Sequence, residues 1–341
     1  MRTALTLEQI ASLARVSRAT VSRVVNNQSG VRDDIRERIW AVVRETGYQP
    51  HAAARSLVTR RTQVVAVIIP ETVNRLFTDP FFPRLLSGIA ATCNNRHYHL
   101  MLALFNGADG QAEMYSRAVG SGHLDGVIMA SAHTGDPLFA SLLRDGVPFV
   151  LAGRHPDERV NYVDVDNVGG ARMAVEHLIR LGHTRIATIT GPLTMAHGED
   201  RLLGYRQALE AHRLPVDERL VVAGDYTEES GSMGMQRLFS ASPTALFAAS
   251  DVMAIGALKA LREAGLRVPE DVALVGFDDL SIASAIVPGL TTVRQPIEHL
   301  GSMAADLLLN SLASPPAAHT PAQRIILPTQ LVLRGSCGAL R

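Results

Sequence analysis

The first sixty residues of the chain place the narrowest limits on its fold, because they specify helix ends as well as helix faces. Thr6 can cap a first helix, and Gln9, three residues later, completes a capping box. Ile10, Leu13 and Ala14 then recur at the spacing that puts apolar side chains on one helical face. A helix this short is marginal alone, so its apolar face requires packing partners nearby in the chain.

A second short helix is expected after a tight turn at residues 14–16, and Ser17 can cap it. Its side chains divide into two sets. The apolar side is formed by Val21, Val24 and Val25, and the outward side by Arg18, Ala19, Ser22 and Arg23. The outward set therefore remains available to a partner outside the helical unit.

A third helix is expected to begin at about Asp33 and to end at Gly47, where glycine suits a positive φ. Its inner face is formed by Ile35, Ile39, Val42 and Val43. Three short helices with a turn between the first two predict a helix-turn-helix, which is a DNA-binding unit.

Charge is divided unevenly along the chain, although the formal net charge is zero. Residues 1–61 contain 11 Arg, no Lys and 5 Asp or Glu, a net charge of +6. The remaining 280 residues contain 22 basic and 28 acidic residues, a net charge of −6. A unit at +6 attracts phosphate, so DNA binding through it should weaken steeply with salt. The alternative is that these arginines form only a solvated helical face.

Three motifs in and after this head occur in a fixed order. They are Val16-Ser-x-x-Thr-Val-Ser-Arg-Val-Val-Asn26, Gly47-Tyr-x-Pro50 and Ala52-Ala-Ala-Arg-Ser-Leu57. With them the chain resembles the lactose-repressor (LacI/GalR) family. The resemblance implies a helix-turn-helix domain at residues 1–50 and a hinge at residues 51–61 that becomes helical on operator DNA. Leu57 would then wedge between central base steps, and Ala54 would leave room for the hinge of a second subunit.

The resemblance also implies how DNA is read. Arg18, Ala19 and Arg23 match positions that face base edges, where Arg can bond bidentately to guanine and Ala can contact a thymine methyl. Thr20 and Ser22 are expected to hold phosphates. The complete set of expected DNA contacts is Thr6, Ser17, Arg18, Ala19, Thr20, Ser22, Arg23, Asn26, Ala54 and Leu57.

The rest of the chain alternates strand-like apolar runs with helical patterns, which predicts an α/β body with parallel sheets covered on both faces. The strand-like runs begin at Val64, His99, Gly126, Phe149, Arg185, Leu220, Ala245 and Val272. Two such series indicate two lobes, and ligands of such sheets bind at the carboxyl ends of the strands. Within a body of residues 62–341, lobe 1 is expected at about 62–161 plus 294–326, and lobe 2 at about 162–293 plus 327–341.

Several classes of protein are excluded by what the sequence lacks. No apolar stretch approaches roughly 18 residues, and no signal peptide precedes the head, so a cytoplasmic protein without a membrane partner is expected. Cys93 and Cys337 are too few for a metal cluster or a disulfide framework. No GxxxxGK[ST], HExxH or GxSxG motif is present. We therefore expect no enzyme activity, no cofactor and no metal.

Motifs of the body match the same family in order. They are Asp79-Pro-Phe-Phe82, Val163-Asp-Val-Asp-Asn167, Gly182-His-x-Arg-Ile-Ala187, Arg201-x-x-Gly-Tyr205, Ser250-Asp251, Val275-Gly-Phe-Asp-Asp279 and Leu290-Thr-Thr-Val-Arg-Gln-Pro296. The resemblance implies a body similar to periplasmic sugar-binding proteins, with two lobes, three crossovers between them and an effector in the cleft.

A sugar would need particular partners in such a cleft. Its hydroxyls require planar groups such as Arg and Asp, and its apolar face requires an aromatic ring. Arg201 matches the arginine with which the family grips sugar hydroxyls, and Asp278 at a strand end would accept hydroxyl hydrogen bonds. The alternatives are a surface arginine and a structural turn residue, and Phe81 either stacks on sugar or packs in the core. The complete expected effector set is Phe81, Arg154, Arg201, Asp251, Asp278 and Gln295.

These interpretations predict an allosteric repressor. A homodimer binds an inverted-repeat operator in double-stranded DNA, and a small sugar rotates the lobes, separates the hinges and releases the operator. Similarity to the cello-oligosaccharide-responsive branch of the family favours a β-linked disaccharide such as cellobiose. Corepression by the same machinery stays open. The rival functions are a sugar-binding or sugar-processing protein without a regulatory role, and a periplasmic transport receptor.

Overall fold

The computed structural model describes residues 5–25, 29–48, 61–104, 107–120, 122–130, 133, 135–313 and 321–339. The chain divides into two units, a head at residues 1–63 and a body at residues 64–341. Residues 51–60 of the expected hinge lie outside the described residues, and so do three expected DNA contacts, Asn26, Ala54 and Leu57.

The described part of the head contains the three expected helices, α1 (Leu7–Ala14), α2 (Arg18–Val25) and α3 (Asp33–Thr46). The predicted capping box at the start of α1 is confirmed, because the Gln9 N–H donates to Thr6 Oγ1 at 3.3 Å and the Thr6 N–H donates to Gln9 Oε1 at 2.8 Å. Arg15 ends α1 in the left-handed region, and Gly47 ends α3 there with φ 64°. These local signals set the lengths of the helices.

The core of the head differs from the prediction at one position. Ile10 and Ala14 are fully buried, but Leu13 is 56% exposed and Ala11 is buried instead. Successive helix residues are about 100° apart, so Ile10, Ala11 and Ala14 share one arc while Leu13 lies about 60° outside it. On the facing helices the buried side chains are Val21, Val24, Ile39 and Val43, and Tyr48 packs over them.

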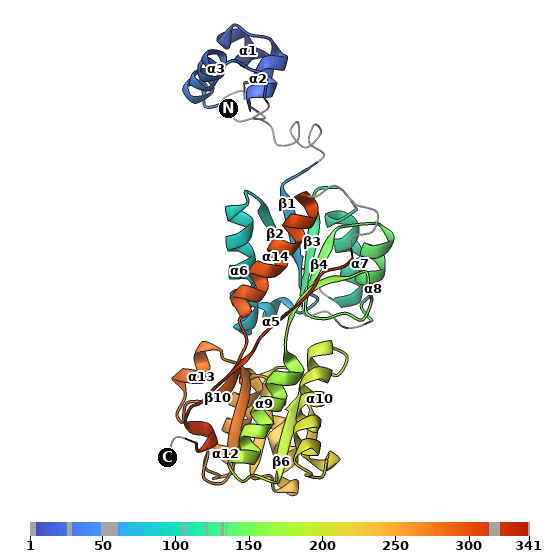
Figure 1. The fold of residues 1–341 in the computed structure, drawn as a ribbon, viewed down its shortest axis with the longest axis vertical. Coiled ribbons are helices and arrows are strands. Elements are labelled where there is room, and N and C mark those ends of the chain that lie inside the picture. The colour runs from blue at the N-terminus through green and yellow to red at the C-terminus, as the bar shows by residue number, and fades with distance from the viewer. Residues whose placement is uncertain are drawn as a thin grey trace. The chain divides into compact units, whose positions relative to one another are not determined.

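The first sheet of the body is wholly parallel, with the strand order β11-β5-β4-β3-β1-β2. Its strands are β1 (Val64–Ile68), β2 (His99–Ala103), β3 (Gly126–Ala130), β4 (Phe149–Ala152), β5 (Asn161–Val165) and β11 (Arg324–Leu327). One face is covered by α6 (Phe81–Asn95) and α14 (Ile297–Ala313), and the other by α7 (Gly107–Ala118) and α8 (Pro137–Arg144), as Figure 1 shows. A short helix, α5 (Val73–Thr78), follows β1.

The second sheet has the order β12-β10-β9-β8-β6-β7, and only β12 runs antiparallel to its neighbour. Its strands are β6 (Ile186–Thr190), β7 (Val221–Ala223), β8 (Ala245–Ala248), β9 (Ala273–Asp278), β10 (Thr291–Arg294) and β12 (Gln330–Val332). Its covering helices are α9 (Asn167–Arg180) and α10 (Ala196–Ala211) on one face and α11 (Glu228–Leu238) and α12 (Asp251–Glu263) on the other. A short helix, α13 (Ser281–Ala285), follows β9.

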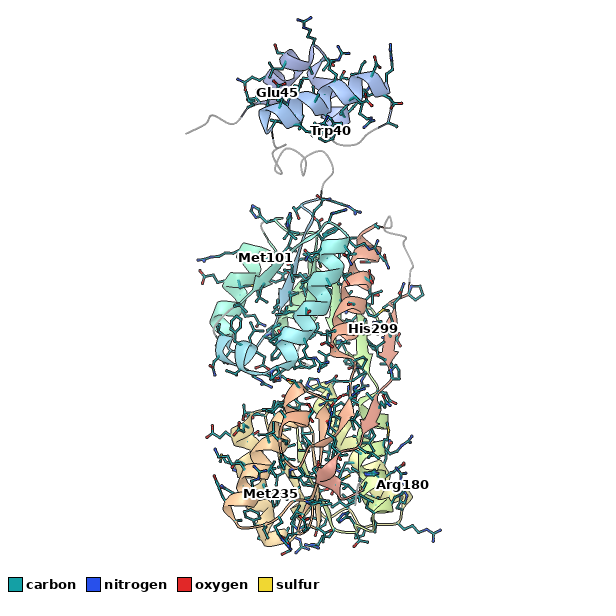
Figure 2. The ribbon with its side chains drawn as sticks, turned by 90° about the vertical axis from the view of Figure 1, so that its left-hand side faces the viewer. Trp40, Glu45, Met101, Arg180, Met235 and His299 are labelled. Carbon is teal, nitrogen blue, oxygen red and sulfur yellow. The ribbon has the colours of Figure 1, made fainter. Side chains whose placement is uncertain are left out.

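The chain passes between the two sheets three times, after β5, after β10 and after β11. The expected change of lobe at residue 162 is wrong by a few residues, because β5 pairs with β4 and β11 through Val165. Figure 2 shows side chains filling both lobes, with Met235 fully buried in the second and His299 exposed on α14 in the first. No helix in the described part of the chain is long and apolar enough to span a membrane.

Candidate functional site: a DNA-facing helix and a polar cleft

The outward side of α2 lies open, as the sequence predicted. Arg18, Ala19 and Arg23 are exposed there. The Arg18 guanidinium pairs with Glu8 of α1, Nε to Oε1 at 3.0 Å, but both side chains are at least 60% exposed, so the pair is weak and replaceable. The arrangement leaves two guanidinium groups of α2 available to an anionic partner.

The Ser17 hydroxyl forms its hydrogen bonds within the helical unit. Its Oγ accepts the Thr20 N–H at 3.1 Å and lies 2.8 Å from Thr20 Oγ1, which confirms the predicted cap of α2. Thr6 is likewise engaged in its capping box, and Ser22 is half-buried. The expected DNA contacts of Ser17 and Thr6 would therefore have to share hydroxyls that already cap helices.

The body contains a cleft of about 590 Å³ of empty space at the carboxyl ends of strands from both sheets, where such folds bind ligands. Its wall contains both polar and apolar side chains. The polar and aromatic residues that line it are Arg75, Asp79, Phe81, Phe82, Asp164, Asn167, His197, Arg201, Tyr226, Ser250, Asp278 and Gln295. Four expected effector residues, Phe81, Arg201, Asp278 and Gln295, are thus brought together.

A buried guanidinium organises the cleft. Arg201 on α10 is only 5% exposed, and its Nε donates to Asn167 Oδ1 at 2.9 Å. Its Nη1 donates to the Ala249 carbonyl at 2.6 Å and lies 3.4 Å from Asp278 Oδ1. The guanidinium also lies over the Phe277 ring, 3.7 Å from its centroid. These contacts offset the desolvation of the charge and fix the plane of the guanidinium.

Asp278 lies opposite this arginine at the end of β9. Its Oδ1 accepts the Gln295 Nε2–H at 2.5 Å, and its backbone has φ 116°, a conformation that non-glycine residues rarely adopt. Burial raises the pKa of the Asp278 carboxyl to about 7, and the positive charge of Arg201 opposes that shift. A strained backbone and a costly buried carboxyl at one residue are typical of a functional position.

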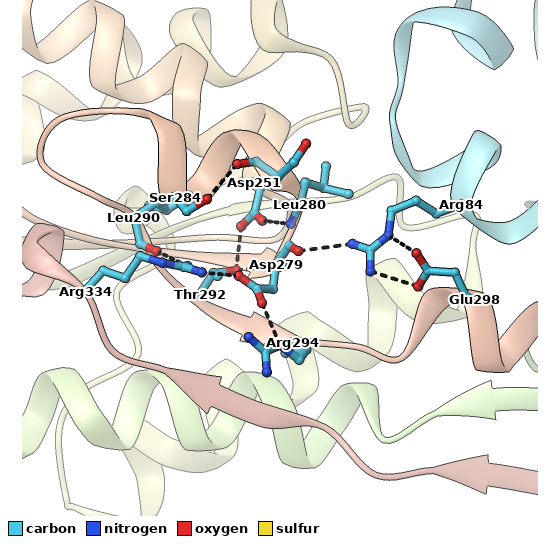
Figure 3. Close-up of polar contacts among 11 residues, drawn as sticks. Arg84, Asp251, Asp279, Leu280, Ser284, Leu290, Thr292, Arg294, Glu298 and Arg334 are labelled. Atoms are coloured by element: carbon cyan, nitrogen blue, oxygen red, sulfur yellow. Dashed lines mark hydrogen bonds and ion pairs between the residues drawn. The ribbon is translucent and has the colours of Figure 1, made fainter. Parts of the chain in front are cut away.

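Ion pairs around the next residue hold that backbone in place (Figure 3). The Asp279 carboxylate accepts from Arg294 Nε and from Arg334 Nη2, each at 2.6 Å. Its carbonyl accepts from Arg84 Nη1 at 3.1 Å, and Arg84 forms a bidentate pair with Glu298 at 2.7 and 2.8 Å. Arg84 and Glu298 belong to α6 and α14 of the first lobe, so this turn of the second lobe is tied to both lobes.

Two expected effector residues lie elsewhere. Asp251 is fully buried behind the cleft, where it accepts the Leu280 N–H at 2.8 Å and the Thr292 hydroxyl at 2.5 Å (Figure 3). It therefore holds the turn that follows Asp278. Arg154 is exposed outside the cleft wall and pairs with Asp200, Nε to Oδ2 at 3.1 Å. Neither side chain lines the cleft, so the structure does not bring these two residues together with the other four expected effector residues.

Comparison with known proteins identifies the family of this chain. Residues 6–51 match the profile of bacterial regulatory proteins of the lacI family, and residues 175–337 match a periplasmic binding protein-like domain. The chain is 43% identical over 337 residues to the HTH-type transcriptional regulator CelR of Thermobifida fusca, covering 97% of this chain and 98% of that protein. The chain belongs to the lacI family. It is a DNA-binding transcriptional regulator with a helix-turn-helix head and a two-lobed body.

Other members of the lacI family are similar over the same length. The ribose operon repressor of Escherichia coli K12 is 34% identical, covering 97% of this chain and 99% of the repressor. A structure of a CelR–cellobiose complex has a TM-score of 0.77 at 40% identity and covers 97% of this chain and 99% of that one. The lac repressor dimer bound to operator and the anti-inducer ONPF has a TM-score of 0.84 at 27% identity, with 98% and 99% covered.

Sequence reasoning missed several residues of this lacI-family cleft. Asp164 at the end of β5 is 5% exposed, and burial raises the pKa of its carboxyl to about 6. Tyr226, with φ 69°, is 8% exposed and stacks on His197 with ring centroids 5.3 Å apart. Asp164 and Asn167 belong to the motif Val163-Asp-Val-Asp-Asn167, which was used only as evidence for the family. The rule that ligands bind at the carboxyl ends of strands would have identified both residues. No signal in the sequence marks Tyr226.

Proposed function

We propose that this protein represses genes for the use of a sugar and that a β-linked disaccharide, with cellobiose the first candidate, binds in the cleft and releases the operator. The observation that carries the proposal is the buried set of Arg201, Asp278 and Gln295 facing open space at the strand ends. The similarity to CelR, whose structure contains cellobiose, supports the choice of ligand. Access to chromosomal DNA requires that the protein acts in the cytoplasm.

Each cleft residue has a proposed role. Arg201 donates to sugar hydroxyls through the Nη2 edge of its guanidinium, which has no acceptor among the described residues, and Asp278 and Gln295 bond further hydroxyls. Phe81 offers an apolar ring surface to a sugar face. Asp251 supports binding indirectly, because it holds the backbone after Asp278.

The head and hinge would read an inverted repeat as a homodimer, as the lac repressor dimer on its operator suggests. Arg18, Ala19 and Arg23 would contact base edges, and Thr20 and Ser22 would contact phosphates. Asn26, Ala54 and Leu57 stay predictions from the sequence.

Arg18→Ala should lower operator affinity by about tenfold or more and affinity for random DNA much less. Arg44→Ala, an equal loss of charge on exposed α3, is the control; equal losses on both DNAs in Arg18→Ala would contradict base reading.

The deciding experiment is fluorescence anisotropy on the duplex upstream of the gene itself, at fixed salt, with and without cellobiose. Tight, sequence-specific binding that cellobiose relieves is the expected result. Binding that cellobiose strengthens would reverse the proposed sign and make the sugar a corepressor. Specific binding that no sugar changes would leave the regulator and overturn the effector. No preference over random DNA on this or any selected site would contradict operator recognition.

A further inference from the structure

Three carboxylates, Asp79, Asp164 and Asp278, line the cleft, and Asp79 and Asp164 each keep one oxygen free of partners among the described residues. Asp164 Oδ1 accepts the Val165 N–H at 2.8 Å and Asn167 Nδ2–H at 3.1 Å, while Asp79 Oδ1 accepts the Phe81 N–H at 3.0 Å. Asp278 Oδ1 interacts with Arg201 and Gln295, and the Asp251 backbone N–H also interacts with the Asp278 carboxylate. Among the described residues, none donates to the Oδ2 atom of Asp79 or of Asp164.

Positive charge in the same cleft is smaller. Among the described residues, only Arg75 and Arg201 contribute guanidinium groups to the lining. Arg75 is paired with Glu71, Nη1 to Oε1 at 3.0 Å, and Arg201 is paired with Asp278, so the carboxylates of Asp79 and Asp164 are left without a paired guanidinium in the lining. A low-dielectric cleft with one dominant sign of charge strengthens its field on whatever enters.

The cleft also presents unused hydrogen-bond donors. The Tyr226 hydroxyl is buried without a partner among the described residues, although a buried hydroxyl normally has one. Arg75 Nε is also buried without a hydrogen-bond partner among the described residues. Free carboxylate oxygens beside free neutral and cationic donors match a ligand whose groups both donate and accept, which is the property of sugar hydroxyls.

We infer that Asp164 makes this cleft selective for uncharged polyhydroxyl ligands and against the same ligands when they carry a carboxylate or a phosphate. The inference rests on the proposed sugar-binding function and narrows it to one charge class. Asp164 is the decisive residue because it adds a second carboxylate to the first lobe, opposite the Arg201–Asp278 pair of the second. Its free oxygen accepts a ligand hydroxyl and repels a ligand anion.

Desolvation supports the same assignment. Burial raises the pKa of the Asp164 carboxyl to about 6, while Arg201 and Arg154 favour its charged form and Asp200 disfavours it. At neutral pH the group is therefore ionised at a cost, and a hydroxyl donor from a ligand stabilises it. An anionic ligand adds like charge to a site in which the carboxylates of Asp79 and Asp164 have no paired guanidinium.

Isothermal titration of the full-length wild-type protein tests the charge argument without any variant. The probes are cellobiose, cellobionate, in which the reducing end is oxidised to a carboxylate, and cellobiose 6′-phosphate. We expect cellobiose to bind at least about tenfold more tightly than either anion at pH 7.5. Equal or tighter binding of both anions would overturn this inference and leave sugar binding standing. Binding of none of the three would overturn the proposed effector together with this inference.

Variants test the assignment to Asp164. Asp164→Asn should narrow the ratio of cellobiose to cellobionate affinity by about tenfold, because it removes the charge and keeps an acceptor. Asp166→Asn is the matched control, since Asp166 lies two residues along and caps α9 outside the cleft, a task that Asn performs as well. If Asp164→Asn does not fold, Asp79→Asn takes its place as the test variant. It removes a less buried carboxylate of the same cleft and should also narrow the ratio of cellobiose to cellobionate affinity. An unchanged ratio in a folded Asp164→Asn protein would overturn the assignment.

Discussion

At the scale of single residues, the planar fork of Arg201 matters more than its charge. Its Nε and Nη1 already serve Asn167 and the Ala249 carbonyl, so only a guanidinium can hold those groups and still present donors to a ligand. We predict that Arg201→Lys weakens cellobiose binding by about 100-fold, or roughly 3 kcal/mol, while the protein without sugar still binds operator. Arg206→Lys on the same helix, where Arg206 pairs with exposed Glu218, should leave sugar binding unchanged. Titration calorimetry measures both, and a normal affinity in Arg201→Lys would contradict the role.

Asp278 should make the stability of the body depend on pH. Burial raises the pKa of its carboxyl from 3.8 to about 7 against the charge of Arg201, and the negative charge of Asp79 adds to the rise. The folded state then binds more protons than the unfolded state between about pH 4 and pH 7, so stability falls as pH rises through that window. The slope is at most about 1.4 kcal/mol per pH unit for one group.

We expect Asp278→Asn to flatten this fall, because the amide does not titrate. The fall of stability with rising pH is measured by thermal unfolding of the body between pH 4.5 and pH 8, with Asp166→Asn as the control. The fall should not vanish, because burial also raises the pKa values of Asp164 and Asp251. An identical pH profile in Asp278→Asn and the wild type would show that this carboxyl titrates normally in the folded protein.

At the scale of elements, α6 and α14 hold the second lobe through one guanidinium. Arg84 donates to Glu298 on α14 and to the Asp279 carbonyl on the turn beside Asp278 (Figure 3). We predict that Arg84→Met lowers sugar affinity about fivefold to tenfold, because the turn loses one charge-assisted hydrogen bond. Arg96→Met removes a comparable α6–α14 contact, with Asn310 and Asp306, that stays within the first lobe. If both variants weaken sugar binding equally, the tie between the lobes has no specific part in it.

Elements were predictable where their signals are local. The Thr6 capping box and Gly47 set helix ends in the head, and apolar runs marked the buried strands β1, β3, β8 and β9. The sequence analysis did not predict the strand β5, because Asp164 interrupts its apolar pattern at a position buried by tertiary contacts. The family motif Ser250-Asp251 suggested that Asp251 is a cleft residue, but of the two only Ser250 lines the cleft. Only the position of β10 shows that the Asp251 carboxylate turns toward Thr292.

At the scale of the whole molecule, the two-lobed α/β architecture followed from the alternation of strands and helices together with the family motifs. The wall of the cleft did not follow, because it gathers residues from segments as distant as Arg75, Asp164, Tyr226 and Gln295. Proximity of that kind depends on the three passages between lobes. Periodicity gives faces and ends of elements, and it contains no information on which ends meet.

Coupling between the cleft and the operator is the last property of the whole molecule that can be tested. Because the two binding steps form a closed thermodynamic cycle, the factor by which cellobiose weakens operator binding must equal the factor by which operator weakens cellobiose binding. We expect a factor of about 5 to 150, measured by anisotropy for DNA and by calorimetry for sugar at the same salt. Higher salt should weaken operator binding steeply, through the head at +6, and leave the affinity of sugar for the free protein nearly unchanged. A factor of 1 in both measurements would mean that sugar and operator bind independently, which would contradict release of the operator by cellobiose.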